Sequence, residues 1–330
     1  MRSTIANAIQ EAEKLLDFST LLHPVNATEQ KQKFLSGEIE EPMFTYANVE
    51  IPNIAFPTYE EEGEIPDLYR DRMQQVSLLA DLLHACGDDE NFSALSLQAF
   101  PLKEITLPED KSPRKPTVGE ESLDAATIAL RFEEALKQCD CNEWNVEIRD
   151  NISARLMVDQ WNSVLVVREG VSLNEAQLQG LIRHEVGVHV LRVHNGRKQS
   201  EPLLHVGTAR GRLIEEGVAI TRECENEPLN PRIVMRHKAV MFAQSHSFRE
   251  TWQMLRDEGY IEEVAWQYAL RIKRGLANGS SSGGFTRDAI YAQAYEEMQS
   301  YVSSIDMNAL LSAPIHPDEI DIFDLQIFKS

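Results

Sequence analysis

One predicted helix contains two histidines, five residues apart, that are candidate ligands of a metal ion. Residues 184–189 read HEVGVH, which is HExxxH, one residue longer than the common HExxH pattern. In a regular α-helix, residues five apart lie about 140° apart around the axis, so His184 and His189 could not both face one metal ion. A single π-turn absorbs the extra residue, and such turns concentrate at functional sites. We therefore expect a π-turn here, with both imidazoles directed at one ion.

A third ligand must come from another segment, because a catalytic zinc has three protein ligands and an open position for water. Residues 212–219, RLIEEGVA, place two adjacent carboxylates in a predicted helix. Neighbours in a helix differ by about 100°, so only Glu215 or Glu216 can face the ion, and spacing alone does not choose between them. A metzincin would need a histidine where Val188 stands, so that class is excluded. His194 is expected to interact with the helix dipole at the helix end.

Three short runs precede the metal-binding helix, at residues 144–150, 153–159 and 163–169. They alternate apolar and polar residues and are separated by polar turns, which predicts a small antiparallel meander. Ser172 and Glu175 have the S-x-x-E spacing of a capping box, so we expect the helix to open there. Asn195-Gly196 is a typical helix stop.

Helical periodicity predicts that most of the remaining chain is α-helical. The predicted segments cover residues 5–16, 70–86, 121–139, 211–223, 231–256 and 261–274, with a last helix from about Asp288. Residues 41–66 contain four prolines and an acidic run, which indicates an extended segment that wraps the protein. Residues 100–121 are rich in proline and charge and are the best candidate boundary. The loop at residues 275–284 could be a lid or a simple connection.

The composition of the chain narrows the classes of function that it can have. The chain has 330 residues, with 53 Asp and Glu against 32 Lys and Arg, so its formal net charge is -21. This size suits one large domain or two modest ones, and the charge argues against nucleic-acid and anionic-membrane partners. No run of 18 apolar residues and no signal peptide are apparent. The four cysteines form no disulfide framework, so we expect reduced thiols and a cytoplasmic location.

The combination of motifs resembles a known family. HEVGVHVLRVHNG at residues 184–196, followed by IEEGVA at 214–219, is similar to the HExxxH/QEGLA metallopeptidases. Bacterial members are described by the QEGLA motif, and eukaryotic members are the microtubule-associated tyrosine carboxypeptidases. Residues 21–46, RIKRG at 271–275 and GGFTRDAIY at 283–291 resemble further family segments. This chain departs from the pattern in EEGVA for EGLA, and in Ala294, where relatives often have glycine.

The resemblance implies an α+β fold, mostly helical and zincin-like, with a small antiparallel sheet before the metal-binding helix. Because it spans the proline-rich boundary, residues 1–118 are expected to form an N-terminal region packed on a catalytic region, 119–330, within one integrated domain. One Zn²⁺ per chain would be held by His184, His189 and Glu216. Glu185 would be the general base, and Tyr291 is the candidate donor to the oxyanion.

The implied activity is that of a carboxypeptidase, which removes a C-terminal residue, aromatic ones included, from a peptide or protein tail. Such an enzyme must bind the terminal carboxylate, a task suited to cationic side chains. The candidates are Arg155, Arg271, Lys273, Arg274 and Arg287. The net charge of -21 disfavours an acidic tail as substrate. Two alternatives stay open: an aminopeptidase similar to dipeptidyl peptidase III, and a non-catalytic metal-binding or regulatory protein.

Overall fold

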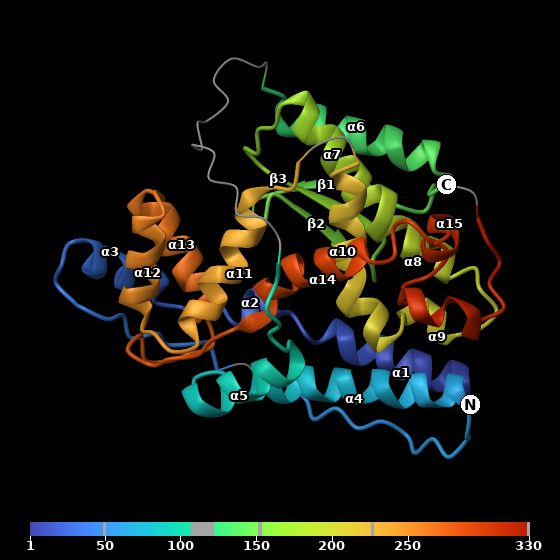
Figure 1. The fold of residues 1–330 in the computed structure, drawn as a ribbon, viewed down its shortest axis with the longest axis horizontal. Coiled ribbons are helices and arrows are strands. Elements are labelled where there is room, and N and C mark those ends of the chain that lie inside the picture. The colour runs from blue at the N-terminus through green and yellow to red at the C-terminus, as the bar shows by residue number, and fades with distance from the viewer. Residues whose placement is uncertain (49–50, 107–121, 151–153, 226–227, 329–330) are drawn as a thin grey trace.

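Helices make up most of the molecule and surround a small sheet, so the fold is α+β (Figure 1). The computed structural model describes residues 1–48, 51–106, 122–150, 154–225 and 228–328. The N-terminal helices are α1 (Arg2–Lys14), α2 (Phe18–Leu21), α3 (Ala27–Leu35), α4 (Glu64–His84) and α5 (Asp89–Ala99). Between α3 and α4, the described part of the predicted wrapping segment contains no regular helix or strand.

The sheet is mixed, and the predicted antiparallel meander is wrong. Its strands are β1 (Asn145–Arg149), β2 (Leu156–Asp159) and β3 (Val164–Arg168), in the order β1-β3-β2. β3 pairs with β1 in parallel and with β2 antiparallel. The central place of β3 follows from its sequence, because its first four residues are all apolar and buried, as in a strand covered on both faces. Alternation in the other two runs shows that they are strands but carries no information on direction.

The predicted metal-binding helix is continuous from α7 (Glu175–His184) through a π-helical turn, η1 (Glu185–Val190), to α8 (Leu191–Gly196). Its predicted end is confirmed, but the predicted capping box is wrong. Asn174 caps the helix, and Gln177 donates its N–H to the Asn174 side chain at 2.8 Å. Ser172 cannot start the helix because the adjacent Leu173 forms a β-bridge with Leu123. Glu175 instead pairs with Arg131 at 2.7 Å.

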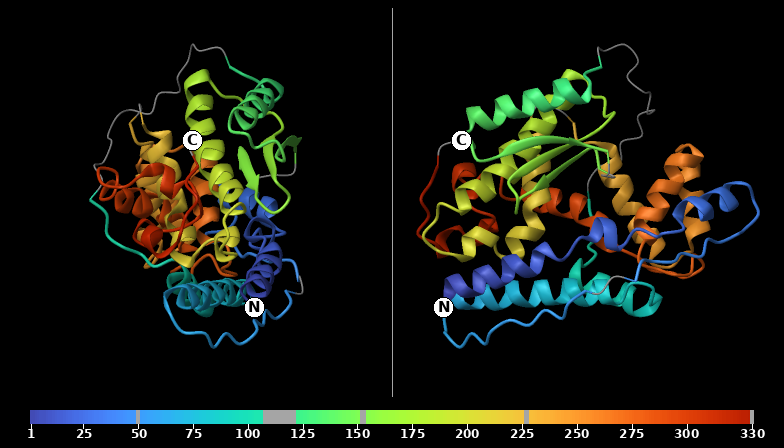
Figure 2. Two further views of the ribbon diagram at one scale, coloured as in Figure 1. Left: turned by 90° about the vertical axis from the view of Figure 1, so that its right-hand side faces the viewer. Right: turned by 180° about the vertical axis from the view of Figure 1, so that it is seen from behind.

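A core behind the sheet holds this helix in place. α6 (Ala125–Gln138) lies along the sheet (Figure 2). The buried side chains of Phe132 from α6, Leu165 and Val167 from β3, and Val186 and Val190 from η1 belong to one cluster. The edge strand β2 contacts η1 directly. The π-helical turn is therefore packed between the sheet and the rest of the protein, rather than exposed at a helix end.

The C-terminal half is helical. Its elements are α9 (Leu203–Val206), α10 (Ala209–Glu223), α11 (Pro231–Ala243), α12 (Phe248–Asp257), α13 (Glu262–Lys273), the 3-10 helix η2 (Thr286–Ala289), α14 (Ile290–Gln299), α15 (Met307–Leu310) and the 3-10 helix η3 (Pro317–Ile322). The single helix predicted over 231–256 is two helices. Ser247 and Glu250 form a capping box that begins α12, which accounts for the break.

Helices α10 and α14 cross in close contact at two small residues. A Cβ atom built on Gly217 would lie 2.1 Å from the carbonyl oxygen of Ala294. The backbones can approach this closely only because position 217 has no side chain. The contact fixes α10, which carries the candidate third ligand, against α14, which carries Tyr291.

The N-terminal helices pack on the part of the chain that follows residue 200. α1 and α4 lie side by side (Figures 1 and 2), and Ile5 and Val76 share a buried cluster with Leu203 and Ile315. The predicted division at residues 100–121 falls largely on residues outside the described ones, so the division into 1–118 and 119–330 stays a prediction. Within the ranges given above, each helix is too short or too polar to cross a membrane.

Candidate metal centre

The π-helical turn brings two histidine rings to one side of the helix, as the spacing predicts. The ring centroids of His184 and His189 are 5.1 Å apart. Gly187 lies within the turn, but a Cβ atom there would be 3.8 Å from the nearest atom, the carbonyl oxygen of Ile182. No neighbouring segment therefore requires a glycine at this position, and the unusual geometry belongs to the turn itself.

Helix α10 supplies the third side chain. Oε2 of Glu216 lies 3.6 Å from Nε2 of His184 and 3.9 Å from Nε2 of His189. These three residues offer ligand atoms within 4.8 Å of one another, and among the described residues they form the group suited to hold a metal ion. Glu215 points elsewhere, as expected for neighbours about 100° apart on a helix.

The donor set and its spacing fit a zinc ion. Bonds of 2.0–2.1 Å in a tetrahedral site place ligand atoms about 3.3 Å apart. The separations from Glu216 exceed this by only a few tenths of an ångström, which small side-chain rotations can close. Two imidazoles and one carboxylate are also the set found in catalytic zinc sites, which leave a fourth position open for water or substrate.

The far nitrogens of both rings are held by carboxylates. Nδ1 of His184 lies 2.8 Å from Oε2 of Glu223, and Nδ1 of His189 lies 2.8 Å from Oε1 of Glu215. A carboxylate can only accept, so each Nδ1 carries the hydrogen and each Nε2 presents its lone pair to the ion. Arg212 donates to the other oxygen of Glu215 at 2.9 Å. The sequence prediction missed both roles, although Glu223 follows Glu216 by seven residues, which is two helical turns.

The electrostatics of the site favour positive charge. Burial lowers the pKa of His184, but hydrogen bonds to Glu216 and Glu223 raise it well above its usual value. Burial raises the pKa of Glu216, but the hydrogen bond to His184 and the charge of His189 lower it to about 2. Burial likewise opposes ionisation of Glu215, and the charge of Arg212 more than offsets it. A proton or a metal cation is thus stabilised between these groups.

The predicted catalytic side chains border this centre. Glu185 follows His184 directly and is half-buried at the start of η1. Tyr291 lies in the first turn of α14, and the guanidinium of Arg236 stands 4.5 Å from the centre of its ring. The charge of Glu216 and burial raise the pKa of Tyr291 to about 12. The phenol therefore keeps its proton at neutral pH and can donate a hydrogen bond.

The predicted substrate-binding cations differ in their exposure and in the groups that they contact. Arg271 donates to Oδ2 of buried Asp288 at 2.5 Å, and Arg274 stacks 4.6 Å from the ring centre of Phe285. Arg155 is exposed. Arg287 is also exposed, its charge acts on Glu216 and Tyr291, and it makes no hydrogen bond or ion pair within the described part of the chain.

Lys273 has a different place. Its side chain is fully buried, and its ammonium donates to the carbonyl oxygens of Ala243, His246 and Ser281 at 3.0, 2.5 and 2.9 Å. This placement does not support the prediction that Lys273 binds substrate, because all three of its donors are used within the protein. The loop at 275–284 is anchored by this contact and by hydrogen bonds to the segment near Pro42, so it is held rather than free as a lid.

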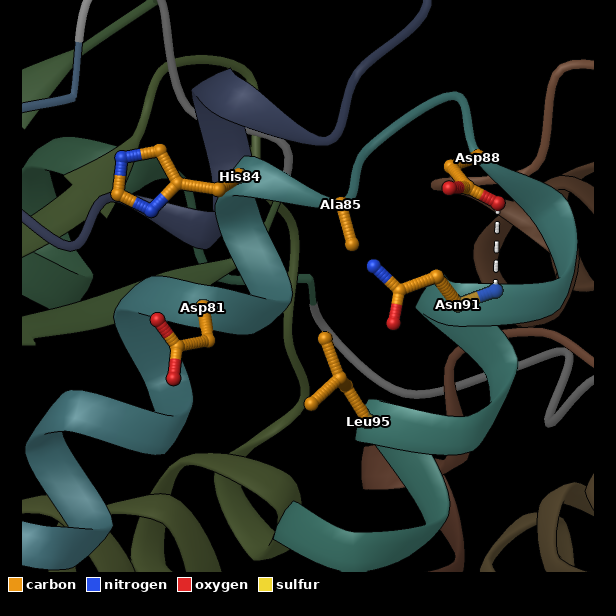
Figure 3. Close-up of a pocket in the computed structure, with 6 residues that line it drawn as sticks. All are labelled: Asp81, His84, Ala85, Asp88, Asn91 and Leu95. Atoms are coloured by element: carbon orange, nitrogen blue, oxygen red, sulfur yellow. Dashed lines mark hydrogen bonds between the residues drawn. The ribbon is translucent and has the colours of Figure 1, made fainter.

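Two other features lie apart from the metal centre. His194 is buried in α8 and its Nδ1 pairs with Glu143, so it has a structural partner of its own. A hollow of about 400 Å³ lies between the end of α4 and the start of α5 (Figure 3). It is bordered by Asp81, His84, Ala85, Asp88, Asn91 and Leu95. These two helices contribute none of the three candidate ligands.

The sequence of this chain is similar to those of known proteins. The family model described as "Microtubule-associated tyrosine carboxypeptidase" matches residues 45–313. Microtubule-associated tyrosine carboxypeptidase 1 of Mus musculus is 24% identical over 301 residues, which cover 88% of this chain and 58% of that protein. The Homo sapiens protein of the same name is 25% identical, with the same coverage. The putative tyrosine carboxypeptidase MATCAP2 of Mus musculus is 22% identical over 90% of this chain and 54% of its own length. The chain thus spans less than two thirds of these relatives.

Proposed function

The chain belongs to the microtubule-associated tyrosine carboxypeptidase family, and from this and its metal centre we propose that it is a zinc-dependent carboxypeptidase. The observation that carries the proposal is the convergence of His184, His189 and Glu216 from two helices, with both Nδ1 atoms already engaged. The substrate is a peptide or protein C-terminal tail. The cytoplasmic location stays a prediction.

The chain's own residues supply the proton transfers. When bound, zinc would polarise the scissile carbonyl and lower the pKa of water at the open position to about 7. Glu185, beside the ligand His184, accepts the proton of the attacking water and passes it to the leaving amine. Tyr291 donates its phenolic hydrogen to the carbonyl oxygen as negative charge develops there. The raised pKa of Tyr291, about 12, keeps that hydrogen available over the neutral range.

Recognition of the terminal carboxylate is assigned to Arg287, with Arg155 and Arg274 as further candidates. Arg287 is exposed, near Glu216, and not committed to another side chain among the described residues, whereas Arg271 is paired with Asp288. A guanidinium can bind a carboxylate through two parallel hydrogen bonds. Arg287→Ala should therefore raise KM for peptides with a free C-terminus by at least tenfold while changing kcat less.

The activity test pairs Glu185→Gln with blocked substrates. The variant should bind zinc as the wild type does and lose about 10²–10⁴-fold in kcat, because only the general base is removed. Amidating the C-terminus of a peptide should abolish cleavage, whereas acetylating its N-terminus should not. The opposite dependence would favour the aminopeptidase alternative. Zinc binding without cleavage of any free-C-terminal peptide would favour a non-catalytic metal-binding protein.

A further inference from the structure

One helix positions both histidines of the metal centre. Glu216 and Glu223 are seven residues apart in α10, so they lie on nearly the same face, about 10.5 Å apart along the axis. The imidazole of His184 spans this interval, with Nδ1 bonded to Glu223 at 2.8 Å and Nε2 facing Glu216 at 3.6 Å. The ring is thus held by a hydrogen bond at Nδ1, in an orientation that turns Nε2 toward Glu216.

Glu223 is itself held by α7. Arg183 donates to the carbonyl oxygens of Arg222 and Glu223 at 3.1 and 3.0 Å, which closes the last turn of α10. One turn earlier, Gly180 of α7 faces the glutamate, and a Cβ atom there would be in van der Waals contact with Cγ of Glu223 at 3.4 Å. The helix that carries His184 therefore also fixes the residue that orients it.

The two carboxylate–histidine pairs are not equivalent. Glu215 is shared between His189 and Arg212, and its side chain is 9% exposed. Removing Glu215 would leave the partly buried guanidinium of Arg212 without this partner, which is a structural cost as well as a cost to the site. Glu223 is 30% exposed at the end of α10, so its removal tests the orientation of His184 with little other damage.

We propose that Glu223 is a positioning residue for the metal centre. It keeps the hydrogen of His184 on Nδ1, holds the ring in the plane that directs Nε2 toward Glu216, and adds negative charge behind a metal ligand. Partners of this kind typically contribute 10–100-fold to metal affinity. This inference rests on the proposed zinc site and adds a residue that none of the sequence motifs contains.

The test is zinc affinity, measured on the full chain by competition with a chromophoric chelator. Glu223→Ala should raise the Kd for zinc by 10–100-fold. Glu223→Gln keeps a carbonyl oxygen that can accept from Nδ1, so it should recover most of this loss. Glu225→Gln is the matched control, because it removes the same charge near the end of α10 from a residue that pairs with Arg222 instead. It should leave Kd unchanged.

A second measurement separates orientation from folding. The visible absorption of the Co²⁺-substituted chain should shift in Glu223→Ala and not in Glu225→Gln, with both variants unfolding at the wild-type temperature. A Glu223→Ala chain that binds zinc as tightly as the control, with the same Co²⁺ spectrum, would overturn the positioning role while leaving the proposed function intact. A wild-type chain that binds neither metal would overturn the zinc site, and the role of Glu223 with it.

Discussion

Replacing Gly217 by alanine should damage both the fold and the metal centre. The new Cβ atom would lie 2.1 Å from the carbonyl oxygen of Ala294, 2.3 Å from its carbonyl carbon and 2.9 Å from its Cβ. The two nearest atoms belong to the backbone of α14, which cannot rotate away as a side chain could. The substitution therefore forces α10 and α14 apart by about 1.3 Å, which would lengthen the contact from 2.1 Å to the 3.4 Å at which ordinary van der Waals contact begins.

Two opposing effects set the magnitude. Overpacking of a tight core typically costs about 1–3 kcal/mol, and this site lies at the upper end because backbone must move. Alanine gains about 1 kcal/mol over glycine in a helix interior. The net loss should be about 2 kcal/mol in the free energy of unfolding. Since Glu216 precedes the substituted residue, the same displacement moves its carboxylate from the two Nε2 atoms and should weaken zinc binding by at least tenfold.

The assay is urea unfolding together with zinc competition, and Gly187→Ala is the matched control. That glycine also lies in a helical segment close to the ligands, yet an added Cβ there would approach no atom closer than 3.8 Å. The control should keep wild-type stability or gain slightly. A Gly217→Ala chain that unfolds at the wild-type urea midpoint and binds zinc equally well would refute the packing argument. Ala294→Gly should not rescue it, because the closest atoms are backbone.

Three other predictions concern charge and metal. Asp288→Asn should cost about 2 kcal/mol near pH 7, because Arg271 overcomes the effect of burial and lowers the Asp288 pKa from 3.8 to about 2. That stability is present above pH 3.8 and lost as the pH falls toward 2, so urea midpoints of variant and wild type should converge there. Lys273→Met should cost about 3 kcal/mol, because the carbonyl oxygens of His246 and Ser281 lose their donor while that of Ala243 still accepts from the N–H of Gly283. It should also speed hydrogen exchange in residues 275–284. Chelation of zinc should lower the unfolding temperature. The Kd for zinc should rise as the pH drops, because protons compete with the ion for His184, whose pKa is raised.

The π-turn at the candidate metal centre was predictable because a helix imposes strict angular rules. Residues five apart cannot share a face, so the sequence of the metal helix predicts a π-turn, and the structure contains one over Glu185–Val190. The same rule reduced the third ligand to Glu215 or Glu216 without choosing. That choice depends on the rotation of α10 about its axis. Gly217 sets this rotation by its contact with Ala294, which lies 77 residues further along the chain.

Other features depend on contacts that local patterns do not encode. Period-two alternation located the strands, but it could not show that β3 pairs in parallel with β1. The end of α11 did carry a local signal, the Ser247 and Glu250 capping box, which was missed because apolar periodicity continues across it. Lys273 was a candidate substrate-binding cation because it stands among arginines. Its burial follows from three carbonyl oxygens contributed by two different segments.

The whole-chain charge of -21 is a poor guide to the substrate, because the cations are not evenly placed. The buried carboxylate of Asp288 is influenced by Arg271, Arg236 and Arg274, and Arg287 acts on the neighbouring Glu216 and Tyr291. Over a distance comparable to the 8–10 Å Debye length, a substrate terminus experiences these arginines rather than the distant acidic surface. The expectation that the net charge disfavours an acidic tail therefore stays a prediction, because it takes no account of these local cations. Arg271 already has a carboxylate partner in Asp288, so under the proposed function it is Arg287 that would bind the terminal carboxylate of a peptide.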